Sequence, residues 1–280
     1  MNEAAEYSVV EIDDEEGVKE RLVLATALLD ANIKQDHTVV ATLKGADLVG
    51  ATYQPLYQPA DFGTEIQQFV RRESVNGTTI TELSTASKLN PRVVAADFVS
   101  MEDGTGIVHI APAFGDEDLG LGQEKELAFV QPVDLQGNVT GNYPFSGKFV
   151  KDADRDIMND LRDRGLLFHR GIYRHTYPFC WRCDTPLLYY PKNSWYIRTS
   201  ALKDQLVSGN SSINWYPDYI KEGRFGEWLR NNVDWAISRE RYWGTPIPIW
   251  QCQECTESLC IGSVKDLQDH ATPGDREKLD

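Results

Sequence analysis

The cysteines and tryptophans of this chain are confined to its second part, and this uneven distribution constrains the fold more than any other feature. All five cysteines and all seven tryptophans lie between residues 180 and 260 of 280. The first 179 residues must therefore build a core from other apolar side chains. The change in composition predicts two domains, residues 1–175 and 176–280, with the boundary near residues 170–178.

Overall composition places the chain among globular proteins that do not enter a membrane. Hydrophobic residues make up 41% and charged residues 25%, and the apolar run Leu22–Leu29 is too short to cross a bilayer. The N-terminus, Met1–Glu6, lacks the basic and apolar regions of a secretory signal. We therefore expect a cytoplasmic monomer. The net charge of −15 argues against non-specific nucleic-acid binding, but it allows a narrow pocket for an RNA end.

Local patterns predict an α+β fold. Strands are expected at residues 7–12, 38–43, 92–98 and 107–110. Helices are expected at residues 18–29, 66–72 and 152–164, the last with Gly165 as its C-cap. Many strands and few helices favour a β-barrel-like first domain with helical insertions. A smaller mixed segment with zinc-knuckle elements is expected to follow it.

One candidate site lies in the stretch Gly104–Asp118. It contains a glycine-rich loop, a run ending at His109, a Pro-Gly turn and three consecutive acids. His109 and Asp118 converge if the turn folds back, and loops after strands commonly hold functional residues. On residue types alone, the structural interpretation is favoured: acids at a solvated helix N-terminus and a histidine within the core.

The cysteines form a second constellation of two Cys-x-x-Cys pairs, Cys180 with Cys183 and Cys252 with Cys255. Without a secretion signal, such pairs indicate zinc rather than disulfides. One zinc ion could bind all four thiolates, or each pair could be half of a separate site. Cys260 lies in an apolar run and is expected to be a buried strand residue.

A third constellation is the aromatic and basic stretch Trp235–Pro248. Arg239 and Arg241 lie among aromatic residues, a glycine and two prolines. Arginines stacked on rings at a domain junction are favoured over contacts with an RNA backbone.

These motifs together resemble a known family. The stretches His175–Pro186, Trp195–Ile197 and Asp234–Pro248 are similar to the isoleucine-specific class I aminoacyl-tRNA synthetases. The pattern Trp-x-x-Ser-Arg-x-Arg-x-Trp-Gly-x-Pro-x-Pro is shared with the leucine and valine enzymes, and the Cys-Trp-Arg-Cys signature is closest to the isoleucine enzyme. Gly104–Asp118 resembles the editing-site signature of the family.

The resemblance implies a proofreading domain that hydrolyses valine wrongly attached to the 3′ end of isoleucine tRNA. Asp118 matches the editing aspartate, and because a free carboxylate is a weak base at pH 7, holding the substrate ammonium is its better role. His109 matches a pocket histidine that excludes isoleucine. Thr105 and Gly106 are expected to line the approach of the adenosine.

The resemblance also implies that the chain is a fragment. The nucleotide motifs His-x-Gly-His and Lys-Met-Ser-Lys-Ser are absent, and so is the threonine-rich editing segment that the family has just before the position of Asn2. ATP and magnesium would then serve only the intact enzyme, and the rest of the synthetase would be a partner. An inactive fragment is the alternative.

The family pattern favours separate zinc half-sites, because each cysteine pair has its partners elsewhere in the family sequence. A single zinc shared by Cys180, Cys183, Cys252 and Cys255 stays the alternative. Two other functions also remain open: the editing domain of a valine or leucine synthetase, and a catalytically silent zinc-ribbon module that binds RNA or packs other domains.

Overall fold

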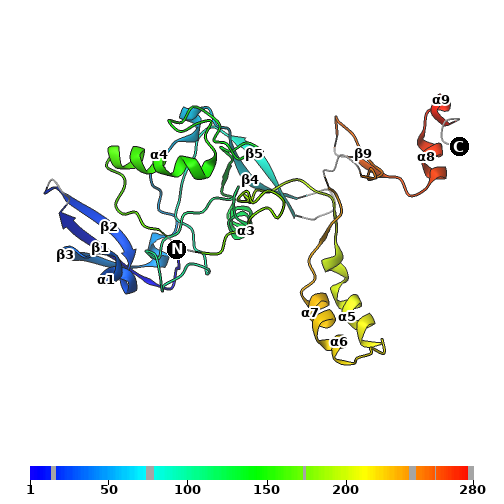
Figure 1. Ribbon diagram of the computed structural model, residues 1–280, viewed down its shortest axis with the longest axis horizontal. Helices are drawn as coiled ribbons and strands as arrows, with labels where there is room; N and C mark the ends of the chain where they lie inside the picture. Colours follow the sequence, from blue (N-terminus) through cyan, green and yellow to red (C-terminus); the bar gives the residue numbers. More distant parts are fainter. Residues whose placement is uncertain (14–16, 74–78, 173–174, 240–243, 256, 277–280) are drawn as a thin grey trace. The chain divides into compact units, whose positions relative to one another are not determined.

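The protein forms two compact units, Met1–Pro191 and Lys192–Asp280. The computed structural model describes residues 1–13, 17–73, 79–172, 175–239, 244–255 and 257–276 (Figure 1). The first unit ends at Pro191, whereas the sequence predicted a domain boundary at residue 175. The predicted boundary between functional domains stays a prediction.

The first sheet of the first unit has the strand order β2-β1-β3 and is antiparallel throughout. Its strands are β1 (Glu6–Asp13), β2 (Lys19–Ala25) and β3 (His37–Lys44). The predicted strands at residues 7–12 and 38–43 are confirmed. Both contain the β-branched residues that favour extended backbone.

The helix predicted over residues 18–29 is wrong. Residues 19–25 form β2, because β1 supplies a continuous ladder of partners from Asp13↔Lys19 to Tyr7↔Ala25. Leu24 is buried while Val23 between Leu22 and Leu24 is exposed, which is the two-residue period of a strand. Only the end of the predicted helix is helical, as the short elements η1 (Thr26–Leu28) and α1 (Leu29–Asn32).

The second sheet has the order β5-β4-β6, formed by β4 (Ile66–Glu73), β5 (Thr79–Ala86) and β6 (Ala128–Val130). The helix predicted at residues 66–72 is therefore wrong. Ile66 and Phe69 are both buried, and their spacing of three resembles a helical period. As residues of a central strand they lie on opposite faces of the sheet, each of which is covered.

The predicted strands at residues 92–98 and 107–110 are also wrong. The first segment makes an isolated bridge between Thr52 and Arg92, and the second has no ladder among the described residues. The mixed α and β character is confirmed, but the described residues form small separate sheets and no closed barrel. A barrel requires each sheet edge to find a partner, and residues 92–98 and 107–110 do not provide one.

Helices complete the first unit. They are α2 (Gly45–Leu48), η2 (Pro59–Phe62), α3 (Asp116–Glu124) and α4 (Val150–Asp163). The predicted helix at residues 152–164 is confirmed by α4. Gly165 follows it with φ +67°, and the N–H groups of Gly165 and Leu166 donate to Arg162 and Leu161, which is the glycine-terminated helix end that the sequence indicates.

The buried core belongs to the first unit. One cluster packs under the first sheet and includes Val10, Ile12 and Leu24. A second joins Phe69, Ala113 and Phe129 beside the second sheet. The candidate loop at residues 104–115 connects these regions, so its ends are fixed by two different parts of the core.

The second unit consists of short elements. Its strands are β7 (Tyr196–Ile197) paired with β8 (Trp235–Ala236) and β9 (Ile249–Gln251) paired with β10 (Ser258–Cys260). Its helices are η3 (Thr199–Leu202), α5 (Lys203–Ser211), α6 (Tyr219–Glu222), α7 (Arg224–Arg230), α8 (Val264–His270) and α9 (Pro273–Arg276). Cys260 lies in a strand as expected, but its side chain is exposed rather than buried.

Candidate functional site

The first end of the candidate loop is held against the first sheet. The Ala25 N–H donates to the Thr105 carbonyl at 2.9 Å, and the buried Tyr7 hydroxyl donates to the Gly106 carbonyl at 2.8 Å. Gly106 has φ +71°, and a Cβ there would lie 2.4 Å from the Cβ of Ala25. Only glycine fits this close approach and this backbone conformation.

The second end of the loop is held by the second sheet and α3. Ala113 is buried with Phe69 and Phe129, and Leu119 of α3 packs against the same cluster. A Cβ on Gly122 would lie 2.9 Å from the Pro112 ring, so α3 rests directly on the turn at residues 111–114. The loop is therefore fixed at both ends by packing.

Asp118 lies in the first turn of α3, together with Asp116 and Glu117. The structural interpretation of these acids as a helix N-terminus is thus confirmed, and negative charge there is stabilised by the helix dipole. The Asp118 carboxylate also folds back, because its Oδ2 accepts the Ala111 N–H at 3.0 Å. Its Oδ1 has no hydrogen-bond partner among the described residues.

Gly115 makes room for this carboxylate. A Cβ on Gly115 would lie 3.1 Å from Oδ2 of Asp118, which is closer than carbon and oxygen normally pack. The backbone of Gly115 is extended, so the requirement for glycine comes from space and not from the left-handed region. The small residue at this position determines where the Asp118 carboxylate lies.

The middle of the loop faces outward. His109 is exposed, and so are Ile107 and Val108 with 41% and 48% of their surface accessible. The interpretation of His109 as a core histidine is therefore wrong. No hydrogen bond or ion pair joins His109 to another described residue. The turn does fold back as predicted, but the contact is between Asp118 and the backbone at Ala111.

Thr105 is also exposed, and its hydroxyl donates to the Ile107 carbonyl at 3.2 Å. Gly106, in contrast, is buried. The side chains of Thr105 and His109 are thus exposed on the outer side of the loop. Gly106 instead allows the loop backbone to pack closely against Ala25. Together with Ile107 and Val108, Thr105 and His109 form an open surface that is part apolar and part polar.

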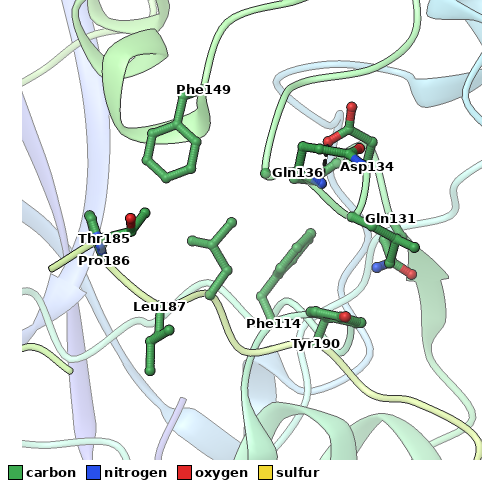
Figure 2. Close-up of a pocket in the computed structure, with 13 residues that line it drawn as sticks. Phe114, Gln131, Asp134, Gln136, Phe149, Thr185, Pro186, Leu187 and Tyr190 are labelled. Carbon is green, nitrogen blue, oxygen red and sulfur yellow. Dashed lines mark hydrogen bonds between the residues drawn. The ribbon is translucent and has the colours of Figure 1, made fainter. Parts of the chain in front are cut away.

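A cavity of about 250 Å³ lies beside this loop. Figure 2 shows Phe149 on one side of it, Phe114 on another, and the turn residues Asp134 and Gln136 next to them. Sequence reasoning did not identify this cavity. Only its Asp-x-x-Gly turn at Asp134–Gly137 carries a local signal, because aspartate and glycine at these positions favour a tight turn.

The Asp134 carboxylate is occupied within that turn. Its Oδ1 accepts the N–H groups of Asn138 at 2.8 Å and Gln136 at 2.9 Å. The Asn138 N–H bond is the main reason that the pKa of Asp134 is lowered from its ordinary value. Asp134 therefore shapes the cavity wall, and the cavity is lined chiefly by apolar side chains such as Phe114, Phe149 and Leu187.

The first cysteine pair lies in a tight turn. The Cys180 N–H donates to Thr185, and the Asp184 N–H returns to the Cys180 carbonyl at 2.8 Å. The Thr185 hydroxyl lies 3.1 Å from Sγ of Cys183. This hydroxyl, the Thr185 N–H and the neighbouring Cys180 thiol lower the pKa of Cys183.

The second pair follows β9 in the second unit. The Cys252 N–H donates to the Glu257 carbonyl at 3.0 Å. The Glu254 N–H points at Sγ of Cys252 at 3.4 Å and lowers the pKa of this thiol, with a further contribution from Cys255. In the part of the chain that the structure describes, no group of three or more histidine, cysteine or acidic side chains is arranged to hold a metal.

Comparison with known proteins decides the family. The family described as tRNA synthetases class I (I, L, M and V) matches residues 6–280. The chain belongs to this family. The resemblance inferred from the motifs is therefore confirmed, and the site residues can be considered within a class I synthetase.

Several relatives of this synthetase chain are described as isoleucine–tRNA ligases. An isoleucine–tRNA ligase of Dehalococcoides mccartyi (strain CBDB1) is 49% identical over 278 residues, covering 98% of this chain and 26% of the relative. Those of Bacillus thuringiensis (strain Al Hakam) and Clostridium novyi (strain NT) are 44% and 40% identical, covering 89% and 96% of this chain and 22% and 23% of the relatives. The chain thus spans about a quarter of their length.

No helix within the described ranges has the length and apolar character needed to cross a membrane. The aromatic and basic stretch expected to matter at Trp235–Pro248 includes residues 240–243, which lie outside the described residues. Of its two arginines, Arg239 is described, and it donates to the carbonyls of Ala236 and Ser238 at 2.9 and 2.8 Å. These local backbone contacts test neither the stacking on aromatic rings nor the RNA contact, and both stay predictions.

Proposed function

We propose that this chain is the proofreading part of an isoleucine-specific synthetase and that it hydrolyses valine wrongly attached to isoleucine tRNA. The family and the isoleucine–tRNA ligases among its relatives support the substrate class. The observation that carries the proposal is local: the Asp118 carboxylate lies in the first turn of α3 and is hydrogen-bonded to the loop that presents His109.

The need for such a site follows from the small difference between the two amino acids. One missing methylene changes binding by about 1–3 kcal/mol, a range known from synthetases of this kind, so a second hydrolytic site is used. The ester that joins valine to the terminal adenosine is already reactive. Holding it in place next to a water molecule can therefore supply much of the rate.

Asp118 is assigned to holding the ammonium group of the attached amino acid. One of its carboxylate oxygens is engaged by Ala111 and the other has no partner among the described residues, which leaves an oriented acceptor. A charge pair at 4 Å contributes roughly 4 kcal/mol at an effective dielectric near 20, and less where solvent enters. A positioned water molecule is the nucleophile.

The other loop residues receive the remaining roles. His109, exposed beside Ile107 and Val108, limits the space for the amino-acid side chain and excludes isoleucine. Thr105 and Gly106 line the approach of the adenosine, Thr105 through its exposed side chain and Gly106 through the close backbone packing that glycine allows. These roles follow the family motif and are consistent with the outward face of the loop.

Zinc is proposed as a structural cofactor. Each cysteine pair supplies two thiolates, and a tetrahedral structural zinc needs four ligands. Because the described residues bring no third ligand to either pair, the donor sets fit two half-sites better than a complete one. Zinc bound there would fix the knuckle turns, while the tight hydrogen bonds around Cys180 and Cys252 already shape them.

Metal analysis of cysteine variants tests this assignment. If the pairs belong to separate sites, Cys180→Ser with Cys183→Ser should leave zinc binding at Cys252 and Cys255 unchanged. One tightly held zinc per chain that is lost when either pair is replaced would instead support a single shared site.

The wider biochemical setting is also proposed. The intact synthetase would use ATP and magnesium to attach isoleucine to its tRNA, and this chain would work with the 3′ end of that tRNA, with misactivated valine and with the remainder of the synthetase. A monomer in the cytoplasm is the expected state. Comparing hydrolysis of tRNAs charged with valine, threonine and methionine separates this proposal from a valine or leucine enzyme.

Deacylation of valyl-tRNA for isoleucine is the decisive assay. It should be measured with this chain and with a version extended at its N-terminus by the threonine-rich segment that the family has before Asn2. Asp118→Ala should lose most of the hydrolysis, whereas Asp116→Ala, an exposed acid of the same helical turn, should retain it. Equal activity of the two variants would refute the role of Asp118.

A further inference from the structure

We propose that Arg71 and Arg92 are positioning residues for the hydrolysis, because they hold the end of α3 opposite to the end that carries Asp118. The Arg71 guanidinium donates a hydrogen bond to the Glu124 carbonyl. The Arg92 guanidinium donates one to the carbonyl of the next residue, Lys125. The inference rests on the proposed function for the role of Asp118 in the reaction, and neither arginine lies in one of the motifs that resemble the synthetase family.

The sequence of α3 provides little that would fix the helix in place. Its nine residues include Gly120 and Gly122, and glycine is unfavourable within a helix relative to alanine. Its apolar side chains are Leu119, which packs against the cluster that contains Phe69, and Leu121, which belongs to a separate cluster. With two such side chains, the contacts at the ends of the helix matter for its position.

The first end of α3 is held by the carboxylate that the proposed reaction uses. Oδ2 of Asp118 accepts the Ala111 N–H at 3.0 Å, and the N-cap residue, Gly115, has no side chain that could cap the first turn. The Asp118 carboxylate therefore anchors the helix and is also assigned to bind the substrate ammonium. A firmly held second end allows the carboxylate to keep its place when a substrate shares its charge.

The second end of α3 is held by β4, the central strand of the second sheet, which packs beside this helix (Figure 1). Glu126, just after this end, has φ +51°, a left-handed conformation that is uncommon outside glycine. Two residues of β4 support it. The Gln68 side chain donates to the Glu126 carbonyl at 3.2 Å, and the Arg71 N–H donates to Oε1 of Glu126 at 2.9 Å.

The guanidinium groups of the two arginines complete this end. The last carbonyls of a helix lack partners within the helix and carry partial negative charge, so cationic donors are favourable there. Arg71 comes from β4, whereas Arg92 comes from the segment after β5, where it forms a bridge with Thr52. The same helix end is thus held from two separate parts of the chain. Both side chains are exposed, so each contact alone has a modest effect.

The held end is close enough to Asp118 for a displacement to reach the carboxylate. Glu124 lies about 9 Å from Asp118 along the helix axis, at about 1.5 Å per residue. Over this length a helix moves nearly as one body, so a shift of the second end also shifts the carboxylate. A misplacement of about 1 Å is enough to slow a reaction that depends on positioning.

Amide hydrogen exchange at Ala111, followed by NMR on this chain, tests the inference without the reaction. The Ala111 N–H is bound by the Asp118 carboxylate, so its exchange rate reports where that carboxylate lies. Arg71→Met combined with Arg92→Met keeps the long side chains and removes their donors. This double variant should raise the exchange rate about tenfold, toward the rate in Asp118→Ala.

The matched control is Arg72→Met combined with Arg155→Met, which removes the same charge. Arg72 follows Arg71 in β4, so its side chain lies on the opposite face of the sheet, and it pairs with Glu82 of β5 at 3.6 Å. Arg155 is an exposed residue of α4. The control should leave exchange at Ala111 unchanged, and equal acceleration in both double variants would overturn the inference.

Exchange at Ala25 distinguishes a local displacement from a general loss of structure. The Ala25 N–H donates to the Thr105 carbonyl at the other end of the loop, and its exchange should stay slow in every variant. Arg71→Lys combined with Arg92→Lys keeps both charges and a donor at each position and should restore most of the protection of Ala111. Unchanged exchange at Ala111 in the methionine variant, or equal acceleration at Ala111 and Ala25, would overturn the inference.

Deacylation of valyl-tRNA by the N-terminally extended chain connects the two arginines to the reaction. The Arg71→Met and Arg92→Met double variant should lower kcat about tenfold and change KM less than twofold, because a displaced carboxylate affects the reacting ester and leaves other contacts with the tRNA in place. Unchanged kcat would contradict the inference. If the original chain itself lacks hydrolysis, the proposed function fails, and exchange at Ala111 still decides whether the arginines position the Asp118 carboxylate.

Discussion

The two units of this protein bury their apolar residues to very different degrees. The first unit, Met1–Pro191, contains clusters that include Tyr7, Val10, Phe69 and Phe129. In the second unit, the buried hydrophobic side chains among the described residues are Leu229 and Ile261. Its large aromatic residues are mostly exposed, with Trp228 at 63% and Trp235 at 61%.

This difference shows that a high content of aromatic residues does not by itself produce a core. The second unit has short strands and helices, so its rings lack a second layer to pack against. The first unit has two three-stranded sheets with helices and loops packed on them, and each adds apolar area that is removed from water. The candidate loop at residues 104–115 gains its fixed shape from that core.

The largest predicted effect concerns the free energy of unfolding, and it tests the difference between the two units. Phe69→Ala should lower the free energy of unfolding by about 3–5 kcal/mol, because it leaves a cavity in a packed cluster. Trp228→Ala should cost less than about 1 kcal/mol, because most of its surface is already in water. Urea unfolding followed by circular dichroism measures both changes.

Phe168→Ala is the matched control, since it makes the same chemical change at a ring that is 52% exposed in the first unit. It should cost less than about 1 kcal/mol. If Trp228→Ala were as destabilising as Phe69→Ala, the second unit would have a core of its own and the comparison would fail.

A smaller effect is expected where the core positions the site. Gly115→Ala should displace the Asp118 carboxylate, because the new Cβ would lie 3.1 Å from its Oδ2, and should lower hydrolysis of valyl-tRNA about tenfold, since small misplacements of a positioning group are costly. Gly120→Ala in the same helix meets no atom within 4 Å.

Gly120→Ala should therefore retain hydrolysis and raise stability by about 0.5–1 kcal/mol, the usual gain of alanine over glycine within a helix. The two variants are compared by deacylation rates and urea unfolding. Normal hydrolysis by Gly115→Ala would show that the position of Asp118 is not set by this packing.

The smallest expected effect concerns pH. Burial and the hydrogen bond from its hydroxyl to Asp160 at 2.6 Å raise the pKa of Tyr57 above the ordinary value of 10.0. The folded state therefore holds the phenol proton more tightly than the unfolded state. The stability contributed by this group is fully present below pH 10 and is lost as the pH rises above it.

Thermal unfolding of the original chain and of Tyr57→Phe across this range checks the sign. The melting temperature of the original chain should fall more steeply above about pH 10 than that of the variant, because phenylalanine has no proton to release. Parallel curves would mean that the contact between Tyr57 and Asp160 does not persist in solution.

Local sequence signals predicted the elements whose residue types favour one conformation. The strands β1 and β3 follow from their β-branched residues, and α4 follows from its helical period and Gly165. The strands β2 and β4 were mistaken for helices, because their hydrogen bonds come from neighbouring strands and their apolar spacing is ambiguous over so few residues.

The candidate site also has one part that the sequence predicted and one part that it did not. Asp116–Asp118 could be identified from sequence as a helix N-terminus, because acids are stabilised there whatever surrounds them. The exposure of His109 could not be identified, since the flanking Val108 and Ile110 suggest a buried strand. Whether a short apolar run is buried depends on what packs over it.

The sequence alone determined the family, the two cysteine pairs and the position of the acids that begin α3, because these depend on residue types at fixed spacing. Only the tertiary structure decided that the Tyr7 hydroxyl binds Gly106, 99 residues away, and that the Asp118 carboxylate rests on the Ala111 N–H. Such contacts form only after sheets and helices have packed, since no local pattern encodes which distant atoms will meet.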